Sequence, residues 1–466
     1  MIADYDVDGV SSAAILSSFL KAVGSACTVH IPDRLTEGYG PSQRAVEQLQ
    51  ANGAQLLVTL DCGVMAHDPL ARAAELGLVT IIVDHHQAGE VLPEAHAVIN
   101  PNRQDDTSGL GYLCAAGVTM IFIAAVNKAL RSRGWYGPER PEPNMLQWLE
   151  LVSLATVCDV VPLKGLNRAY VTQGLKIMAR RENMGLSSLA DVSRLKRKPD
   201  TYALGYLLGP RINAAGRIGN AALALKLLTT ADKGEAAQIA QELERLNRER
   251  QDIEIAVVNQ AMFQADAMLG KERRAAVLVV SGKGWHPGVV GLAAARLKER
   301  FNLPSFVLAE DKDGRLAAGS GRSISGVDLG SAVREAFESG LIEKGGGHAM
   351  AAGLTVLKER LGDLRGFMEE RLAAQVQAAQ DRALSIDAAL TAGGATLELI
   401  ELLEQAGPYG TAHPSPVFAF PAHRVLYADA AGSDHIRCTI AGSDGKRLKA
   451  IAVSYTHLRA HETRED

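Results

Sequence analysis

The sequence has few aromatic residues and no long hydrophobic run. Phe, Trp and Tyr make up 5% of the 466 residues, and no apolar stretch is long enough to cross a membrane. The five cysteines are scattered without Cys-x-x-Cys spacing, which excludes a disulfide framework and a cysteine-based zinc site. The net charge of -4 gives no global sign of polyanion binding, so any such contact has to come from local patches or metal ions. We expect a cytoplasmic protein that makes no membrane contact.

Both ends of the chain look unusual. The first acidic cluster begins at Asp4, although a metal-binding loop normally needs a full strand before it to hold its register. We therefore expect that the natural protein begins earlier and that this chain is a fragment. Residues 454–466 are polar, lack periodicity and differ from what precedes them. We interpret them as a foreign tail, and we do not count His457 or His461 as ligands.

Strands and helices alternate in the first part of the chain, which predicts an α/β fold with a doubly wound parallel sheet. The length is too great for one core, so several domains are expected. We predict a catalytic α/β domain over 1–231, a long connector helix over 232–270, a second, smaller α/β domain over 271–357, a helical linker over 358–383, and an incomplete β-barrel over 384–453.

Three acidic clusters stand where strands are expected to end, two of them directly after apolar, strand-like runs. Asp84-His85-His86 follows residues 78–83, Asp61 follows residues 56–60, and the segment Asp4-Tyr5-Asp6-Val7-Asp8-Gly9 opens the chain. A fourth acid, Asp159, ends the apolar segment 149–157. Because the carboxyl ends of parallel strands meet at one edge of a sheet, these groups are expected to converge.

A pocket of carboxylates with one or two imidazoles is typical of a divalent-metal site. Carboxylate-rich sets suit Mn²⁺ or Mg²⁺ better than Zn²⁺, and two such ions can clamp a phosphate and activate a water molecule. A single Asp after a strand is usually only a turn residue, so the hypothesis depends on the whole set. The expected metal ligands are Asp6, Asp8, Asp61, His85 and Asp159, with Asp4 and His86 as supporting or proton-handling catalytic groups.

Glycine-rich segments recur later in the chain. Residues 209–217 (GPRINAAGR) are predicted to be a glycine-bounded loop with arginines and an amide, suited to a phosphodiester. Residues 282–291, 319–323 and 345–353 are predicted to be further loops whose backbone can approach a phosphate. The basic run 194–198 is either a solvated loop or a phosphate-tracking patch. The β-rich residues 384–453 suggest a small barrel of the kind that binds single-stranded nucleic acid.

These segments together resemble the DHH phosphoesterase family, and within it the branch of bacterial single-strand-specific exonucleases. The resemblance covers nearly all of residues 2–453 and keeps the family's order of motifs. It is carried by DYDVDG at 4–9, DCG at 61–63, DHH at 84–86, TVCDVVPL at 156–163, GPRINAAGR at 209–217, GWHPGVVG at 284–291, SGRS at 320–323 and GGGHAMAAG at 345–353.

The resemblance implies 5′-to-3′ removal of nucleotides from single-stranded DNA, dependent on Mn²⁺ or Mg²⁺, in recombination and repair. It also implies that the second α/β domain is DHHA1-like and that the C-terminal barrel is an OB-like domain. We expect a monomer, with a helicase and a single-strand-binding protein as further partners. The positions where the family binds the substrate's phosphates or end are Arg211, Asn213, Ser320, Arg322, Gly346, Gly347 and His348.

Two other hypotheses remain open on the sequence. The first is a related hydrolase of short oligonucleotides, cyclic dinucleotides or nucleotide phosphates, because the metal set alone cannot separate these substrates. The connector helix and the extra barrel favour a long strand. The second is a non-catalytic scaffold, against which stands the complete set of carboxylates.

Overall fold

The structure is a computed structural model that describes residues 1–34, 36–270, 275–379, 385–432 and 435–453. Its chain divides into two compact units, one comprising residues 1–161 and 169–382 and the other residues 162–168 and 383–466. The predicted foreign tail lies outside the described residues. None of the helices within the described ranges is both long and apolar enough to cross a bilayer.

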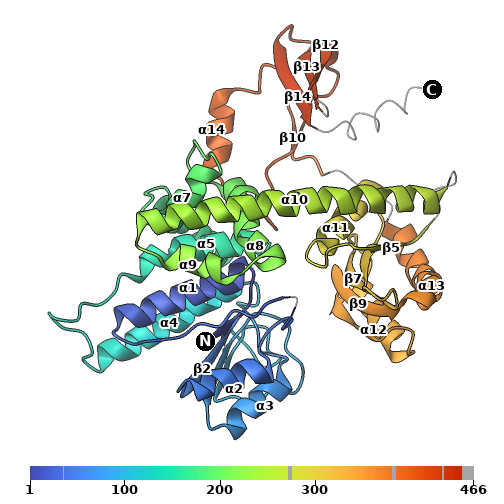
Figure 1. The fold of residues 1–466 in the computed structure, drawn as a ribbon. Coiled ribbons are helices and arrows are strands. Elements are labelled where there is room, and N and C mark those ends of the chain that lie inside the picture. Colours follow the sequence, from blue (N-terminus) through green and yellow to red (C-terminus); the bar gives the residue numbers. More distant parts are fainter. Residues whose placement is uncertain (35, 271–274, 380–384, 433–434, 454–466) are drawn as a thin grey trace. The chain divides into compact units, whose positions relative to one another are not determined.

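A four-stranded parallel sheet in the order β1-β2-β3-β4 begins the first unit, as the sequence predicts. Helices α2 and α3 pack against it through a small apolar core that includes Val46, Leu70 and Ile82, while α1 and α4 contact it as well (Figure 1). The elements are β1 (Ile2–Ala3), α1 (Val7–Ala22), α2 (Gln43–Ala51), β2 (Leu56–Leu60), α3 (His67–Glu75), β3 (Val79–Val83), β4 (Ala97–Ile99) and α4 (Ala115–Ser132).

A helical layer follows the sheet. It comprises the 3₁₀ turn η1 (Met145–Trp148), α5 (Leu149–Cys158), α6 (Gly165–Met178), α7 (Met184–Val192), the π-helical segment η2 (Ala203–Leu208), α8 (Gly209–Ile218) and α9 (Ala222–Thr229). The prediction of a loop at 209–217 is wrong, because this segment is helix α8. Pro210 stands in its first turn, where its missing N–H is harmless, and the alanines that follow favour a helix.

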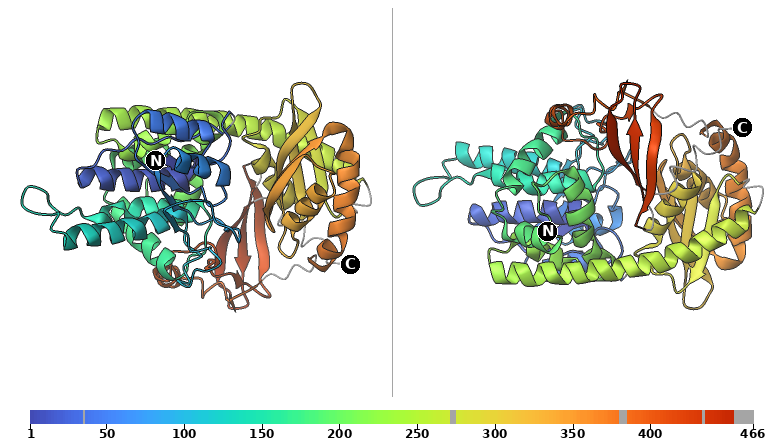
Figure 2. Two further views of the ribbon diagram at one scale, coloured as in Figure 1. Left: turned by 90° about the horizontal axis from the view of Figure 1, so that it is seen from below. Right: turned by 90° about the horizontal axis from the view of Figure 1, so that it is seen from above.

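Helix α10 (Lys233–Leu269) runs unbroken for 37 residues, as predicted, and is the long yellow-green helix in Figures 1 and 2. The side chain of Asp232 caps its start by accepting from the backbone N–H of Glu235, and Gly270 ends it with a positive φ of 55°. Its first half packs on α7, α8 and α9, and its second half packs on α11 and β5. One helix therefore carries apolar residues of two separate cores.

The second sheet has five strands in the order β5-β6-β7-β9-β8. Its elements are β5 (Leu278–Lys283), α11 (Val290–Phe301), β6 (Ser305–Glu310), β7 (Leu316–Arg322), α12 (Leu329–Glu338), β8 (Lys344–His348), β9 (Ala351–Leu357), η3 (Lys358–Arg360) and α13 (Leu361–Ala379). The segments 319–323 and 345–353, predicted to be loops, lie mainly in strands. Glycine is needed there for close packing, since a Cβ at Gly319 would lie 2.1 Å from the Val307 carbonyl oxygen.

The second unit contains a three-stranded antiparallel sheet in the order β12-β13-β14 and a short parallel pair, β10 with β11. The sequence predicted a β-rich segment over 384–453, and most of its regular structure is indeed strand, but the helix α14 (Leu397–Gln405) was not predicted. The elements are β10 (Ala388–Ala389), α14 (Leu397–Gln405), β11 (Phe418–Ala419), β12 (Arg424–Ala431), β13 (His435–Ala441) and β14 (Arg447–Val453).

Glu150, in the first turn of α5, is a buried acid outside the acidic clusters singled out in the sequence. Burial, with a further contribution from Glu182, raises the pKa of Glu150 from 4.5 to about 7. The folded state therefore holds this proton more tightly than the unfolded chain does. Its stabilising contribution is complete below pH 4.5 and is lost as the pH rises through 7.

We expect Glu150→Gln to stabilise the protein at pH 8 by up to about 3 kcal/mol relative to the wild type, because the amide carries no charge to desolvate. The difference should shrink steadily as the pH falls toward 5. Urea unfolding across this range measures it, with the exposed Glu94→Gln as control. A destabilisation of equal size at every pH would contradict the expectation.

Candidate metal centre and phosphate-binding surface

Three neighbouring strands of the first sheet end in acids at one edge. Ala3 pairs with Leu60, and Leu60 pairs with Val83, so the residues that follow β1, β2 and β3 emerge side by side. These residues are Asp4, Asp61 and Asp84. The chain turns sharply at two of these strand ends: Asp61 has a positive φ of 60°, and a Cβ at Gly9 would lie 2.5 Å from the Asp4 carbonyl oxygen.

Helix ends bring the other acids to the same edge. The Asp6 side chain caps α1 by accepting from the backbone N–H groups of Asp8 and Gly9, at 2.8 and 3.1 Å. Asp8 accepts from the N–H groups of Ala115 and Ala116 at the start of α4, at 2.6 and 2.8 Å. Asp159 is the residue that ends α5, so it follows a helix rather than a strand.

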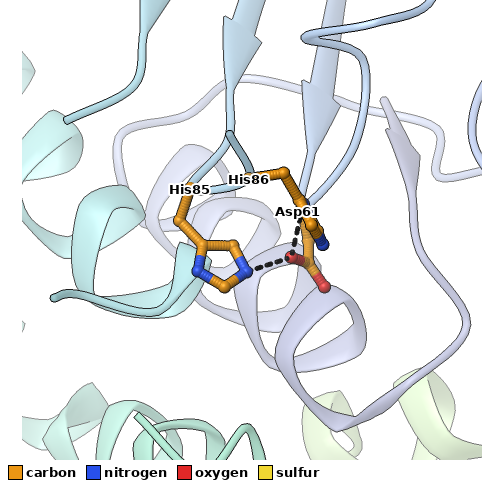
Figure 3. A group of neighbouring side chains, drawn as sticks. All are labelled: Asp61, His85 and His86. Carbon is orange, nitrogen blue, oxygen red and sulfur yellow. Dashed lines mark ion pairs between the residues drawn. The ribbon is translucent and has the colours of Figure 1, made fainter. Parts of the chain in front are cut away.

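His85 lies at the centre of this cluster. Its Nε2 is 3.2 Å from Oδ1 of Asp61 and 3.7 Å from Oδ2 of Asp8, and its Nδ1 is 3.7 Å from Oδ2 of Asp159. Figure 3 shows the ion pairs that Oδ1 of Asp61 forms with both His85 and His86. Three groups of side chains could each hold a metal ion, because the ligand atoms within each group lie within 4.8 Å of one another. The groups are Asp61 with His85 and His86, Asp8 with His85 and Asp159, and Asp4 with Asp6 and Asp61. All seven predicted metal and catalytic side chains thus meet at one place.

The electrostatics of the cluster fit divalent cations. Burial, reinforced by neighbouring acids, raises the pKa values of Asp4 and Asp61 well above their ordinary range and that of Asp159 to about 9. Within the described part of the chain, one carboxylate oxygen each of Asp4, Asp61 and Asp159 is buried without a hydrogen-bond partner. Such groups cost free energy unless a positive charge compensates them. Hard carboxylate oxygens with imidazole nitrogen match Mn²⁺ or Mg²⁺.

His86 belongs to a hydrogen-bonded group beside the cluster. Its Nδ1 lies 2.7 Å from Oδ1 of Asp84 and 3.2 Å from the hydroxyl of Tyr39. Burial alone would lower the pKa of His86, but the hydrogen bond and charge of Asp84 outweigh it and raise that pKa. Asp84 is also held by the N–H of Val64. With Nδ1 engaged in this way, Nε2 is the ring atom left for exchanging a proton.

No pattern in the sequence pointed to Tyr39, yet its hydroxyl also donates to the Asp61 carbonyl oxygen at 2.9 Å. We expect Tyr39→Phe to lower kcat about tenfold, because outer hydrogen bonds of this kind orient the groups around a metal centre. Metal affinity should stay close to that of the wild type, since Tyr39 contacts Asp61 through the backbone carbonyl and not through the carboxylate. Steady-state rates and metal titration measure the two effects. A kcat unchanged within about twofold would contradict this role.

Arginines gather next to the cluster. Arg217 of α8 is half-buried and donates to the Gly288 carbonyl oxygen at 3.0 Å. Burial, with the charges of Arg34, Arg250 and Arg322 nearby, lowers the pKa of Arg217 to about 10. A Cβ at Gly288 would lie 2.4 Å from the Arg217 carbonyl oxygen, so only glycine permits this approach. Clustered, partly desolvated guanidinium groups are typical of a phosphate site.

Asn213 and Arg211 of α8 face different neighbours. The side-chain oxygen of Asn213 accepts from the N–H of Val7 at 3.1 Å, which ties α8 to the start of α1. Arg211 forms an ion pair with Glu244 of α10 at 2.6 Å and also donates to the Leu207 carbonyl oxygen. Its role in substrate binding stays a prediction. Arg217, which belongs to the segment predicted to suit a phosphodiester, interacts electrostatically with Asp6, and Arg34, which was not predicted, interacts with Asp4.

The remaining predicted substrate residues lie in two rows across β7, β9 and β8. Arg322 pairs with Ala351, which pairs with His348, and Ser320 pairs with Gly353, which pairs with Gly346; Gly347 lies between the two rows. A Cβ at Gly291, near the start of α11, would lie 3.0 Å from a guanidinium nitrogen of Arg322. A cavity of about 840 Å³ is lined by Arg34, Trp285, His286, Ser320 and others. The roles of these residues stay predictions.

Comparison with known proteins gives the same domain order. The family model for the N-terminal domain of the DHH family matches residues 1–156, that for the DHHA1 domain matches 274–374, and that for the RecJ OB domain matches 386–462. The single-stranded-DNA-specific exonuclease RecJ of Salmonella typhimurium is 36% identical over 94% of this chain and 77% of its own length. RecJ of Escherichia coli is 35% identical with the same coverage.

Solved structures similar to this chain belong to the same group of exonucleases. The crystal structure of RecJ from Thermus thermophilus with Mn²⁺ has a TM-score of 0.78 and 30% identity, covering 96% of this chain and 62% of that one. The crystal structure of an exonuclease RecJ bound to manganese has a TM-score of 0.67 and 31% identity, and the match covers 82% of this chain and 91% of that one.

The parallel sheet with acids and imidazoles at its edge, followed by a DHHA1 domain and an OB domain, defines a metal-dependent DHH phosphoesterase. The chain belongs to the RecJ exonuclease family within that class. Its cofactors are accordingly Mn²⁺ or Mg²⁺, which the related structures contain.

Proposed function

We propose that this chain removes nucleotides from single-stranded DNA in the 5′-to-3′ direction, releasing 5′-mononucleotides, in DNA recombination and repair. The observation that carries the proposal is the meeting of seven acidic and imidazole side chains beside a cluster of arginines. A helicase and a single-strand-binding protein as partners, a monomeric state and a cytoplasmic location belong to the same proposal.

Asp6, Asp8, Asp61, His85 and Asp159 would hold the metal ions. When bound, such ions polarise a phosphate and lower the pKa of a water molecule toward neutrality. Within the chain, Arg34, Arg217 and Arg322 bind phosphate oxygens and so fix the strand against the carboxylate cluster. His86, whose pKa is raised by Asp84, donates a proton from Nε2 to the departing 3′ oxygen. Asn213 keeps the start of α1, and with it Asp6 and Asp8, in place.

The test is degradation of about 20-nucleotide single strands in Mn²⁺, with a label at the 5′ or the 3′ end. We expect mononucleotides from the 5′ end, and no product when a bulky protein blocks that end. Duplex DNA and dinucleotides serve as competing substrates. Faster cleavage of dinucleotides than of long strands would replace the proposal with the short-oligonucleotide hydrolase, and release from the 3′ end would overturn the polarity.

A further inference from the structure

Two exposed tyrosines stack on each other outside the cluster of acids and arginines. The rings of Tyr202 and Tyr206 are 5.0 Å apart between centroids and inclined by 26°. Tyr202 is 54% exposed and Tyr206 is 70% exposed. An i,i+4 aromatic pair stabilises a helix only slightly, and the helical segment here is anchored on its other side by the buried Leu204 and Leu208. The tyrosines therefore do not serve the core.

A basic segment precedes this pair, and one of its arginines contacts Tyr202. The guanidinium of Arg197 lies over the Tyr202 ring at 5.8 Å and is also paired with Asp200 at 3.0 Å. Arg194, Lys196 and Lys198 belong to the same segment, and both lysines are solvent-accessible. Accessible aromatic faces among lysines and arginines are the combination that binds single-stranded nucleic acid without sequence preference.

The tyrosines also belong to the same helical segment as two residues described above. Tyr202 and Tyr206 precede Asn213 and Arg217 on one continuous segment, formed by η2 and α8. Leu208, Ile212 and Ala215 of this segment are buried, whereas the two tyrosines are exposed. Asn213 contacts the start of α1 beside Asp6 and Asp8.

We propose that Tyr202 and Tyr206 form a stacking platform for bases of the substrate strand beyond the nucleotide being removed, with Arg194, Lys196 and Lys198 binding the accompanying phosphates. The proposal rests on the proposed function, because it extends the path of the same single strand. The platform holds the strand through the faces of its bases, so it does not select sequence.

The test compares Tyr206→Ala with Tyr206→Phe, which keeps the ring, and with Phe263→Ala, which removes an aromatic side chain of α10 that is 78% exposed. Each is made in the Asp61→Asn background, so that bound strands are not degraded. For a strand of about 20 nucleotides we expect Tyr206→Ala to raise Kd about tenfold. The Kd of Tyr206→Phe should stay within about threefold of that of the background protein, and the Kd of Phe263→Ala should equal that of the background protein. Equal melting temperatures verify folding.

Two further measurements make the test specific. Replacing Lys196 and Lys198 by glutamine should reduce the slope of log Kd against log salt concentration by about 1.4, because each lost phosphate contact contributes about 0.7. A strand carrying 5-iododeoxyuridine should photocrosslink to Tyr202 or Tyr206. With Asp61 intact, the ratio of the rate on the long strand to the rate on a dinucleotide should fall about tenfold in Tyr206→Ala.

The outcomes separate the alternatives. Unchanged DNA affinity in Tyr206→Ala would overturn the platform, and so would crosslinks confined to other residues. Loss of a protein partner with full retention of DNA affinity would reassign the surface to protein binding and overturn it too. If the proposed function itself fails, the unaltered protein neither binds nor degrades single strands, whereas failure of the platform alone leaves both intact.

Discussion

Replacing Asp61 by asparagine is expected to lower the exonuclease rate by about a thousandfold or more, because Asp61 takes part in two of the three potential ligand sets. The same change should stabilise the metal-free protein by about 1 to 2 kcal/mol. Burial and the charges of Asp8, Asp6, Asp4 and Asp159 make the ionised form of Asp61 unfavourable in the folded protein. An asparagine side chain cannot ionise, so this unfavourable free energy is absent from the variant.

Thermal unfolding with and without Mn²⁺ measures the second effect. The wild type should gain a large increase in Tm on adding Mn²⁺, and Asp61→Asn should begin from a higher Tm and gain little. The matched control is Asp252→Asn, at an exposed position of α10, which should behave like the wild type in every assay. A variant that keeps both its activity and its metal-induced stabilisation would refute the assignment of Asp61.

Replacing Arg322 by alanine is expected to lower kcat/KM on single strands about a hundredfold, with most of the effect in KM. Arg322 is largely buried, and burial together with the charge of Arg34 lowers its pKa. A desolvated guanidinium next to other cations gains most when a phosphate arrives, since charge-assisted hydrogen bonds are strong in such surroundings. Arg322→Lys should recover only part of the loss, because lysine lacks the two-pronged geometry.

The control for Arg322 is Arg371→Ala, which removes an exposed arginine paired with Glu335 on the same domain. Strands with a 5′-phosphate and with a 5′-hydroxyl should be compared. If Arg322 binds the terminal phosphate, its loss removes the preference between the two ends. Unchanged kcat/KM on both strands would show that the arginine cluster does not bind the substrate.

The metal cluster was accessible from the sequence because strand ends and acids are both local features. A β-branched run followed by Asp predicts a strand end at Asp61 and Asp84, and parallel pairing then brings the two together. Asp159 reaches the same place from the end of a helix, a position the apolar run alone could not distinguish from a strand. Arg34 and Tyr39 were missed because neither lies in a patterned element; only the folded chain places them beside Arg217 and His86.

The glycine-rich segments were harder to interpret. Glycine serves both loops and tight packing, and the sequence does not distinguish these uses. At Gly321 an added Cβ would lie 2.4 Å from the Phe306 ring, so the glycine admits a neighbour from within the sheet. At Gly346 the same atom would meet nothing within 4 Å, which leaves the strand surface open. Only the surroundings of each position reveal which use applies.

The length of helix α10 fixes both the distance and the relative rotation between its two halves. Adding one residue near its middle would advance everything beyond it by about 1.5 Å and rotate it by about 100°. Val257, Ala261 and Ala265 are buried against the second sheet, so that sheet would turn with them relative to the first half of the helix. Insertions of seven residues would nearly restore the orientation at the cost of about 10 Å of displacement. The length of α10 therefore fixes how the two cores that it joins are oriented, which the length of a surface loop does not.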